Sequence, residues 1–172
     1  MKYLTILRHA KSSWKFALLP DKERPLNERG KKAVIALGKY LSGRHIKPDA
    51  IICSPALRSV KTARGVAKAI GVSKKDIHVI NGIYEADAMS LFSIIKDLDN
   101  SLGDVVLVGH EPGLSEVIKL LTGKTIEKFP TCAAYRINFN IEHWSAIKSG
   151  TGKCEFYVNP KLLEEKKTNF IQ

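Results

Sequence analysis

The 172-residue sequence has little cysteine, few aromatic residues and no long apolar run. Its three cysteines, Cys53, Cys132 and Cys154, are odd in number, widely spaced and without a Cys-x-x-Cys pair, which excludes a disulfide framework and a zinc ribbon. We expect them to be reduced thiols in the core. No apolar run approaches the roughly 20 residues that span a bilayer, and Arg8 interrupts the amino-terminal run without a cleavage pattern. The sequence therefore predicts a cytoplasmic protein with no membrane partner.

Acidic residues are also scarce. The chain has 17 Asp and Glu and 28 Lys and Arg, which gives a net charge of +11. This balance favours an anionic partner, which includes nucleic acid, a phosphorylated protein and a small phosphorylated metabolite. Aromatic residues make up only 8% of the chain, and no nucleic-acid-binding motif occurs, so nucleic acid is the least favoured of the three. The 44% of hydrophobic residues are enough for one core, and we expect a single domain over residues 1–172.

Short apolar runs alternate with longer segments of helical period over the first 123 residues. The runs that predict strands are Tyr3–Leu7, Ala50–Cys53, Ile77–Ile80 and Val105–Val108. Helices are predicted from the cap Asn27 to about Ser42 and Gly43, from Ser54 and Pro55 to Gly71, from the cap Asp87 to about Leu98, and from Pro112 and Gly113 to Gly123. Such alternation indicates parallel strands that are connected by helices.

The last fifty residues have a different pattern. Two further strands, Ala134–Phe139 and Cys154–Val158, are joined by residues 140–153 and predict an antiparallel addition at one edge of the sheet. Lys161–Lys167 is a mixed-charge segment that we interpret as a solvated face or a frayed end. The predicted fold class is α/β, a three-layer α/β/α sandwich with a mostly parallel sheet and an antiparallel edge addition.

The residues that follow the predicted strands are rich in cations. In an α/β sheet, ligands bind beyond the carboxyl ends of the strands, where this chain has Arg8 and His9, Ser54 to Arg58, Tyr84 and Glu85, and Gly109 to Gly113. Arginine forks match phosphate oxygens, and a neutral imidazole is a competent nucleophile toward phosphorus. His9 is the better nucleophile candidate because it directly ends a strand, whereas His110 precedes a helix whose dipole favours an anion.

These motifs resemble a known family. Leu7-Arg8-His9-Ala10 is similar to the Arg-His-Gly signature of the histidine phosphatase superfamily, in the form of its SixA-type phosphohistidine phosphatase branch. Arg24-Pro25-Leu26, Ser54-Pro55 through Arg58 with Thr62, and Gly109-His110-Glu111-Pro112 resemble further motifs of that branch, in the same order along the chain. Ala10 replaces the usual glycine, which the SixA-type branch tolerates. The resemblance implies a phosphoglycerate mutase-like fold.

The resemblance also implies roles for individual residues. His9 is the expected nucleophile, and Arg8, Arg58 and His110 form the expected phosphate pocket, with Lys11 and Arg24 as added charge at its rim. The proton donor is expected to be Glu85, with Asp87 and Glu111 as alternatives. No metal or other cofactor is expected, because the remaining histidines have no metal-ligand spacing. Trp14 and Trp144 are interpreted as packing residues.

The uncertain proton donor bears on the substrate. An alkoxide needs a proton from a positioned acid, whereas the imidazole of phosphohistidine leaves more easily, so a phosphoamidate or an activated ester is favoured. No connection between the motifs is long enough for a large lid, which predicts a shallow, open pocket suited to phosphohistidine on a protein. The alternatives are a broad small-molecule phosphomonoesterase and an inactive phosphate-binding adaptor. The sequence does not indicate the oligomeric state.

Overall fold

A single six-stranded sheet runs through the computed structural model, which describes residues 1–169. The strands lie in the order β3-β2-β4-β1-β5-β6. Their bounds are β1 Lys2–Arg8, β2 Ala50–Cys53, β3 Ile77–Val79, β4 Asp104–Gly109, β5 Ala134–Phe139 and β6 Lys153–Val158. Strands β3, β2, β4 and β1 pair in parallel, while β5 and β6 continue the sheet as antiparallel neighbours. The predicted mostly parallel sheet with an antiparallel addition is confirmed.

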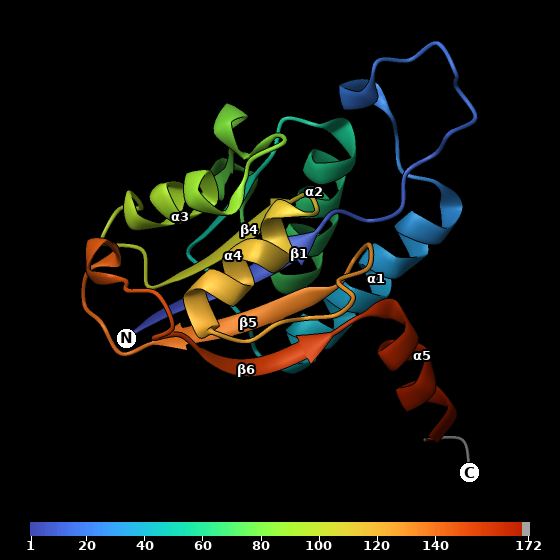
Figure 1. Cartoon of the computed structure of the whole chain (residues 1–172). Helices are drawn as coiled ribbons and strands as arrows, with labels where there is room; N and C mark the ends of the chain where they lie inside the picture. Colours follow the sequence, from blue (N-terminus) through green and yellow to red (C-terminus); the bar gives the residue numbers. More distant parts are fainter. Residues whose placement is uncertain (170–172) are drawn as a thin grey trace.

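Within residues 1–169, five α-helices cover the two faces of the sheet (Figure 1). They are α1 Glu28–Gly43, α2 Leu57–Ile70, α3 Ala88–Lys96, α4 Gly113–Thr122 and α5 Pro160–Asn169. Helices α1 and α2 bury Leu37, Val66 and their neighbours against one face, and α3 and α4 bury Leu91 and Ile118 against the other. Successive side chains of a strand point to opposite faces of the sheet, so each strand contributes to the core on both sides. Leu107, for example, faces α4, and Val108 faces α2. The three-layer α/β/α sandwich is therefore confirmed.

Most of the predicted helix boundaries agree with the structure. The side chains of Asn27 and Asp87 cap α1 and α3 as expected, and Gly71 and Gly123 end α2 and α4 with φ angles of +76° and +72°. The predicted start of α2 at Ser54 is wrong, because this helix begins at Leu57. The Ser54 hydroxyl accepts from the backbone N–H of Ala56 and thereby shapes the turn before the helix.

The carboxyl-terminal segment differs from the expectation of a frayed end. Residues Pro160–Asn169 form α5, and Leu163 in this helix is only 8% exposed because it packs into the core under α1. A single buried apolar residue in a charged segment does not produce a helical hydrophobic pattern. The sequence therefore predicted only the solvated face of this segment. That part of the prediction is correct, since Lys161 and Glu164 are exposed. No helix among residues 1–169 combines the length and apolar character that a membrane span requires.

The sheet topology decides where the sequence motifs at the strand ends meet. Strand β1 lies between β4 and β5, and the parallel register places Arg8 beside Gly109. His9 and His110 therefore leave the sheet side by side, and the backbone N–H of His9 donates to the carbonyl of Gly109 at 3.1 Å. Strand β2 flanks β4 on the other side and delivers Ser54 to the same edge, where its N–H donates to Val108.

Candidate active site

His9 directly follows β1 and is 8% exposed. Its Nδ1 lies 2.8 Å from the carbonyl oxygen of Ala10, which can only accept, so Nδ1 carries the proton in the neutral ring. The lone pair of the ring is therefore on Nε2, which accepts from Nε of Arg58 at 3.3 Å. This arrangement presents the unprotonated nitrogen of the imidazole to the cationic side of the site.

Arg58, in the first turn of α2, is buried and donates to three acceptors. Besides the contact with His9, its Nη1 donates to the carbonyl of Asp21 at 2.7 Å and its Nη2 to the Asp21 carboxylate at 2.9 Å. Thr62, one turn further along α2, accepts from the N–H of Ala10 and donates to the carbonyl of Arg58. The predicted pair of Arg58 and Thr62 thus ties α2 to the loop that carries His9.

Asp21 is part of the site although the sequence analysis did not single it out. It lies in a short 3-10 helix, η1 (Asp21–Glu23), in the connection between β1 and α1. Its Oδ2 accepts from the Tyr84 hydroxyl at 2.7 Å as well as from Arg58, and its Oδ1 accepts from Arg24 Nη1 at 3.0 Å. The hydrogen bond from Tyr84, followed by that from Arg58, lowers the pKa of Asp21 to about 2, so this carboxylate is ionised at neutral pH.

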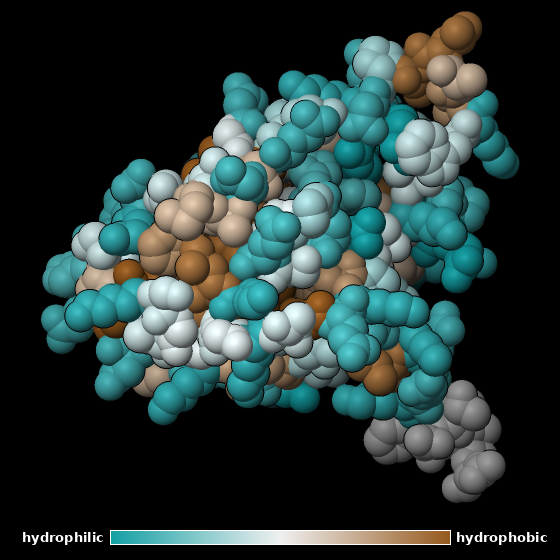
Figure 2. Space-filling model, viewed as in Figure 1, coloured by the Kyte–Doolittle hydropathy of each residue, from teal (hydrophilic) through white to brown (hydrophobic). Residues whose placement is uncertain are grey.

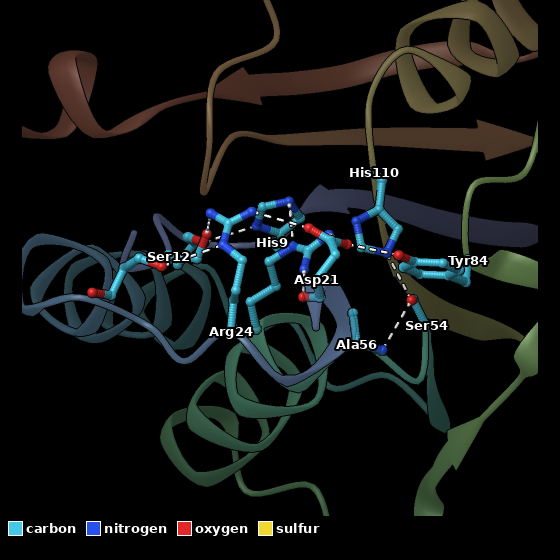
Figure 3. A network of polar contacts seen from close by, with 11 residues as sticks. His9, Ser12, Asp21, Arg24, Ser54, Ala56, Tyr84 and His110 are labelled. Carbon is cyan, nitrogen blue, oxygen red and sulfur yellow. Dashed lines mark hydrogen bonds and ion pairs between the residues drawn. The ribbon is translucent and has the colours of Figure 1, made fainter. Parts of the chain in front are cut away.

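The Asp21 contacts bring the connection between β1 and α1 to the site. The connection from β1 to α1 is long enough to bring η1 across the site, where Asp21 bridges residues from α2 and from the segment before α3 (Figure 3). Polar loop residues have no periodicity, so the only sequence signal was an Asp three positions before Arg24. Tyr84 was noted after the third strand without a role, and it now pairs edge-on with His110 at 5.5 Å between ring centroids.

Arg24 is buried and reaches the site from the same connection. Its Nη2 donates to the hydroxyl of Ser12 and its Nε to the carbonyl of Ser13 at 3.3 Å. The Trp14 ring lies against its guanidinium, 3.2 Å from ring centroid to Cζ. The interpretation of Trp14 as a packing residue is wrong, because its side chain is 77% exposed and stacks on Arg24, whereas Trp144 is fully buried as predicted.

Arg8 is the last residue of β1, and its guanidinium donates through Nη1 to the carbonyl of Phe129 at 3.0 Å. Its buried Nε has no hydrogen-bond partner among the described residues. Burial lowers the pKa of Arg8, while the charge of Glu111 opposes this shift. The loop after α4 is held against this strand end, since the N–H of Cys132 lies 3.1 Å from the carbonyl oxygens of both Arg8 and His9.

His110 faces His9 from the end of β4, with 5.1 Å between the ring centroids. Its Nε2 shares a hydrogen bond of 2.7 Å with the Ser54 hydroxyl. Burial, with the charges of His9 and Arg58, lowers the pKa of His110 to about 3. Burial is also the largest cause for His9, whose pKa falls to about 4 with a contribution from Arg58. Both imidazoles are therefore neutral at physiological pH.

A pocket of about 290 Å³ opens at this cluster. We refer to it as the active pocket, and its lining includes five residues predicted from the sequence: Arg8, His9, Lys11, Arg24 and Arg58. The other lining residues are Ser12, Trp14 and Thr131. His110 reaches the same cluster through its contact with His9. Four cations around a neutral imidazole form a site suited to a polyanion such as a phosphoryl group.

None of the three candidate proton donors is among the residues that line the active pocket. Glu85 has an exposed side chain and a left-handed backbone with φ of +54°. Asp87 caps α3 by accepting from the N–H of Ser90, and Glu111 accepts from the N–H of Ser115 at 2.8 Å. The role of Glu85 stays a prediction. Residues 1–169 hold no group of three His, Cys, Asp or Glu side chains suited to a metal ion.

Comparisons with known proteins agree with this geometry. Residues 4–93, more than half of the chain, match the family model of the histidine phosphatase superfamily, branch 1. An uncharacterised chloroplastic protein of Arabidopsis thaliana is 31% identical over 169 residues, which covers 91% of this chain and 77% of the plant protein.

Solved structures share the fold. The protein histidine phosphatase SixA complexed with tungstate superposes with a TM-score of 0.80 at 21% identity, covering 94% of this chain and 99% of SixA. A protein of Agrobacterium tumefaciens that is named as a phosphohistidine phosphatase SixA also has a TM-score of 0.80, at 24% identity, with 92% and 98% of the two chains covered. This chain therefore belongs to the histidine phosphatase superfamily, and it is a phosphatase with the fold of the SixA proteins.

Proposed function

We propose that this phosphatase removes phosphoryl groups from phosphohistidine in proteins, through a covalent intermediate on His9. The observation that carries the proposal is the state of the His9 ring, in which Nδ1 is bonded to the Ala10 carbonyl and the Nε2 lone pair points at Arg58. A neutral imidazole in a fixed orientation, surrounded by guanidinium groups, is suited to attack phosphorus.

The first step transfers the phosphoryl group. Nε2 of His9 forms a bond to phosphorus while the bond from phosphorus to the leaving imidazole nitrogen breaks, and this nitrogen keeps the electron pair. The other ring nitrogen of the substrate histidine carries a proton, so neutral histidine leaves. In this proposal Arg8, Arg58 and His110 hold the phosphoryl oxygens, and Lys11 and Arg24, which also line the active pocket, add positive charge. Their role is to stabilise the charge that spreads over the transferred group.

The second step releases phosphate. A water molecule attacks phosphorus, the bond to His9 Nε2 breaks, and inorganic phosphate leaves with His9 in its neutral state. The carboxylate of Asp21 accepts from the same Arg58 and Arg24 guanidinium groups that would hold the phosphoryl oxygens. When substrate binds, these guanidinium groups therefore release the Asp21 carboxylate and donate to the phosphoryl oxygens instead.

Two features support a protein as substrate. The connection beside the active pocket carries apolar side chains into solvent, and Figure 2 shows them as a brown projection over that loop; Phe16 is 56% exposed, Leu18 fully and Leu19 37%. Exposed apolar groups of this kind are typical of surfaces that contact other proteins. In addition, Asp87 and Glu111 are engaged by backbone N–H groups and Glu85 is exposed, which disfavours alkoxide leaving groups more than the imidazole of phosphohistidine.

The test is hydrolysis of p-nitrophenyl phosphate and of a histidine-phosphorylated peptide, in the presence of EDTA, by the wild type and His9→Ala. We expect turnover by the wild type, none by His9→Ala, and binding of tungstate by both, because the cations remain. His78→Ala, a change at an exposed histidine on β3, is the matched control and should retain full activity. Turnover by His9→Ala would exclude the covalent mechanism.

The alternatives have distinct outcomes in the same assay. A small-molecule phosphomonoesterase would hydrolyse alkyl phosphates at least as well as the phosphohistidine peptide. An inactive adaptor would bind tungstate and turn over neither substrate. Location in the cytoplasm stays a prediction.

A further inference from the structure

A groove of about 670 Å³ lies next to the active pocket and is not used by the proposed chemistry. It runs between α1, the loop before β5 and the start of α5, and it shares Lys11 and Thr131 with the lining of the active pocket. The two spaces are therefore adjoining parts of one surface. We call this space the basic groove, after the five exposed cations that surround it: Lys11, Arg29, Lys32, Lys128 and Lys161.

The charge of the basic groove is unbalanced. Glu164 is the one carboxylate in its lining, and no ion pair between described residues involves any of the five cations. Figure 2 shows the hydrophilic surface that extends between α1 and α5. Grouped like charges repel one another, and their mutual repulsion is relieved when an anionic partner binds.

The floor of the basic groove is apolar. Ala33 and Ala36 of α1, together with Pro130, Pro160 and Leu163, belong to the same lining as the five cations. Among residues 1–169, the part of the chain that the structure describes, no aromatic residue lines the groove. A nucleic acid would favour aromatic platforms on which its bases stack, whereas an acidic protein segment offers both carboxylates for the rim and aliphatic side chains for the floor.

We propose that the basic groove is the docking site for an acidic segment next to the phosphohistidine of the protein substrate. This inference rests on the proposed function and names the class of substrate, a phosphoprotein whose histidine lies among Asp and Glu residues. The phosphoryl group would enter the active pocket while the neighbouring carboxylates contact Lys32, Lys128 and Lys161. A small phosphorylated molecule has no such acidic segment to place in the groove.

The test compares two synthetic peptides, each with one histidine phosphorylated by potassium phosphoramidate. The acidic peptide has Asp and Glu on both sides of the histidine, and its match has Asn and Gln at the same positions. The groove variant is Lys32→Glu with Lys161→Glu, and the matched control is Lys74→Glu with Lys75→Glu, the same change of charge on the 3-10 helix beside β3 at the far edge of the sheet.

We expect the wild type and the control variant to prefer the acidic peptide by about tenfold in kcat/KM, and the groove variant to lose this preference, since each reversal exchanges an exposed attraction for a repulsion. Turnover of p-nitrophenyl phosphate should change less than about twofold, because neither lysine lines the active pocket. Equal turnover of both peptides by the wild type, or an equal loss in the control variant, would overturn the docking proposal while leaving the phosphatase function intact.

A binding measurement keeps the two proposals separate. Fluorescence anisotropy of the labelled, unphosphorylated acidic peptide should give a Kd about tenfold higher for the groove variant than for the wild type, and this result does not depend on turnover. Unchanged binding would contradict the proposal. Tighter binding of a single-stranded oligonucleotide of equal charge, lost in the groove variant, would overturn it in favour of nucleic acid.

Discussion

Oδ2 of Asp21 accepts a hydrogen bond from Nη2 of Arg58 at 2.9 Å, across 37 positions of the sequence. The same guanidinium donates to Nε2 of His9, so one arginine connects the candidate nucleophile with a carboxylate. A carboxylate and a phosphoryl group compete for such a fork. The first prediction follows from this competition.

Asp21→Asn should strengthen binding of inorganic phosphate. The change removes a negative charge from the site and weakens the interaction with Arg58. We therefore expect the inhibition constant of phosphate to fall by about threefold to tenfold. The 46% exposure of the Asp21 side chain places the effect nearer to about threefold, because solvent screens the charge. The measurement is inhibition of p-nitrophenyl phosphate hydrolysis by phosphate. Glu23→Gln makes the same change of charge two residues away and should have little effect. A higher inhibition constant for Asp21→Asn would contradict the competition.

Arg58→Lys should lower kcat/KM by about 100-fold. Lysine keeps the charge but cannot donate to His9 and Asp21 at once as the guanidinium does, and one charge-assisted contact is worth about 1.5 to 3 kcal/mol, with more in the transition state. Steady-state kinetics with the phosphohistidine peptide provide the measurement. Arg64→Lys, on the exposed side of the same helix, is the control. If the activity of Arg58→Lys is close to that of the wild type, the several hydrogen bonds of the Arg58 guanidinium are not needed for catalysis.

The two histidines should stay neutral well below the usual range of histidine. Burial lowers the pKa of His9 to about 4 and that of His110 to about 3, so lowering the pH from 7 to 5 leaves both rings unprotonated. Two-bond ¹H–¹⁵N NMR spectra report the protonation of each nitrogen, with signals assigned from His9→Asn and His110→Gln. We expect neutral His9 with hydrogen on Nδ1 at pH 5. A midpoint near 6.5 for either ring would contradict the burial argument.

The same pKa shifts affect stability. Between about pH 6.5 and pH 4 the unfolded chain binds protons at these histidines and the folded chain does not, so the free energy of unfolding falls as the pH falls through this window. The slope is up to about 1.4 kcal/mol per pH unit for each histidine. Urea unfolding at several pH values measures it, and bound phosphate, which favours protonated rings, should reduce the slope.

Glu85→Gln tests the proton donor. If Glu85 is the acid, the rate for phosphoserine, which has an alkoxide leaving group, should fall by about 100-fold, while the rate for phosphohistidine changes by less than about threefold. Glu111→Gln and Asp87→Asn are the comparison variants, since these carboxylates already accept backbone hydrogen bonds. A selective loss with Glu111→Gln and none with Glu85→Gln would assign the role to Glu111.

Gly30→Ala should reduce both stability and activity. A Cβ at this position would lie 2.2 Å from the carbonyl oxygen of Lys11, so the backbone of the active pocket must move. Overpacking of this kind costs about 1 to 3 kcal/mol. Gly43→Ala, at the other end of α1 with no atom within 4 Å of the added Cβ, should leave activity unchanged and stabilise the helix by up to about 1 kcal/mol. Thermal unfolding and kinetics of the two variants give the comparison, and equal behaviour would contradict it.

Local pattern was sufficient for much of the fold. Strands such as Ala50–Cys53 and Ala134–Phe139 agree with the structure to the residue, and the caps Asn27 and Asp87 were recognisable because capping depends on side chains within three positions. His9, Arg8, Arg58 and His110 could be selected because parallel strands deliver their carboxyl ends to one edge.

Contacts between distant positions were decided only by the tertiary structure. Asp21 meets Tyr84 across 63 positions, and Leu163 packs into a core built mainly by α1, α2 and the sheet. Neither residue belongs to a periodic or capping pattern, because polar loops and single apolar contacts carry no local signal. The sequence by itself determined the six strands, the presence of helices α1 to α4 and the cationic chemistry at the strand ends. Chain folding decided which carboxylate faces Arg58 and which cations line the basic groove, since these depend on distances through space and not along the chain.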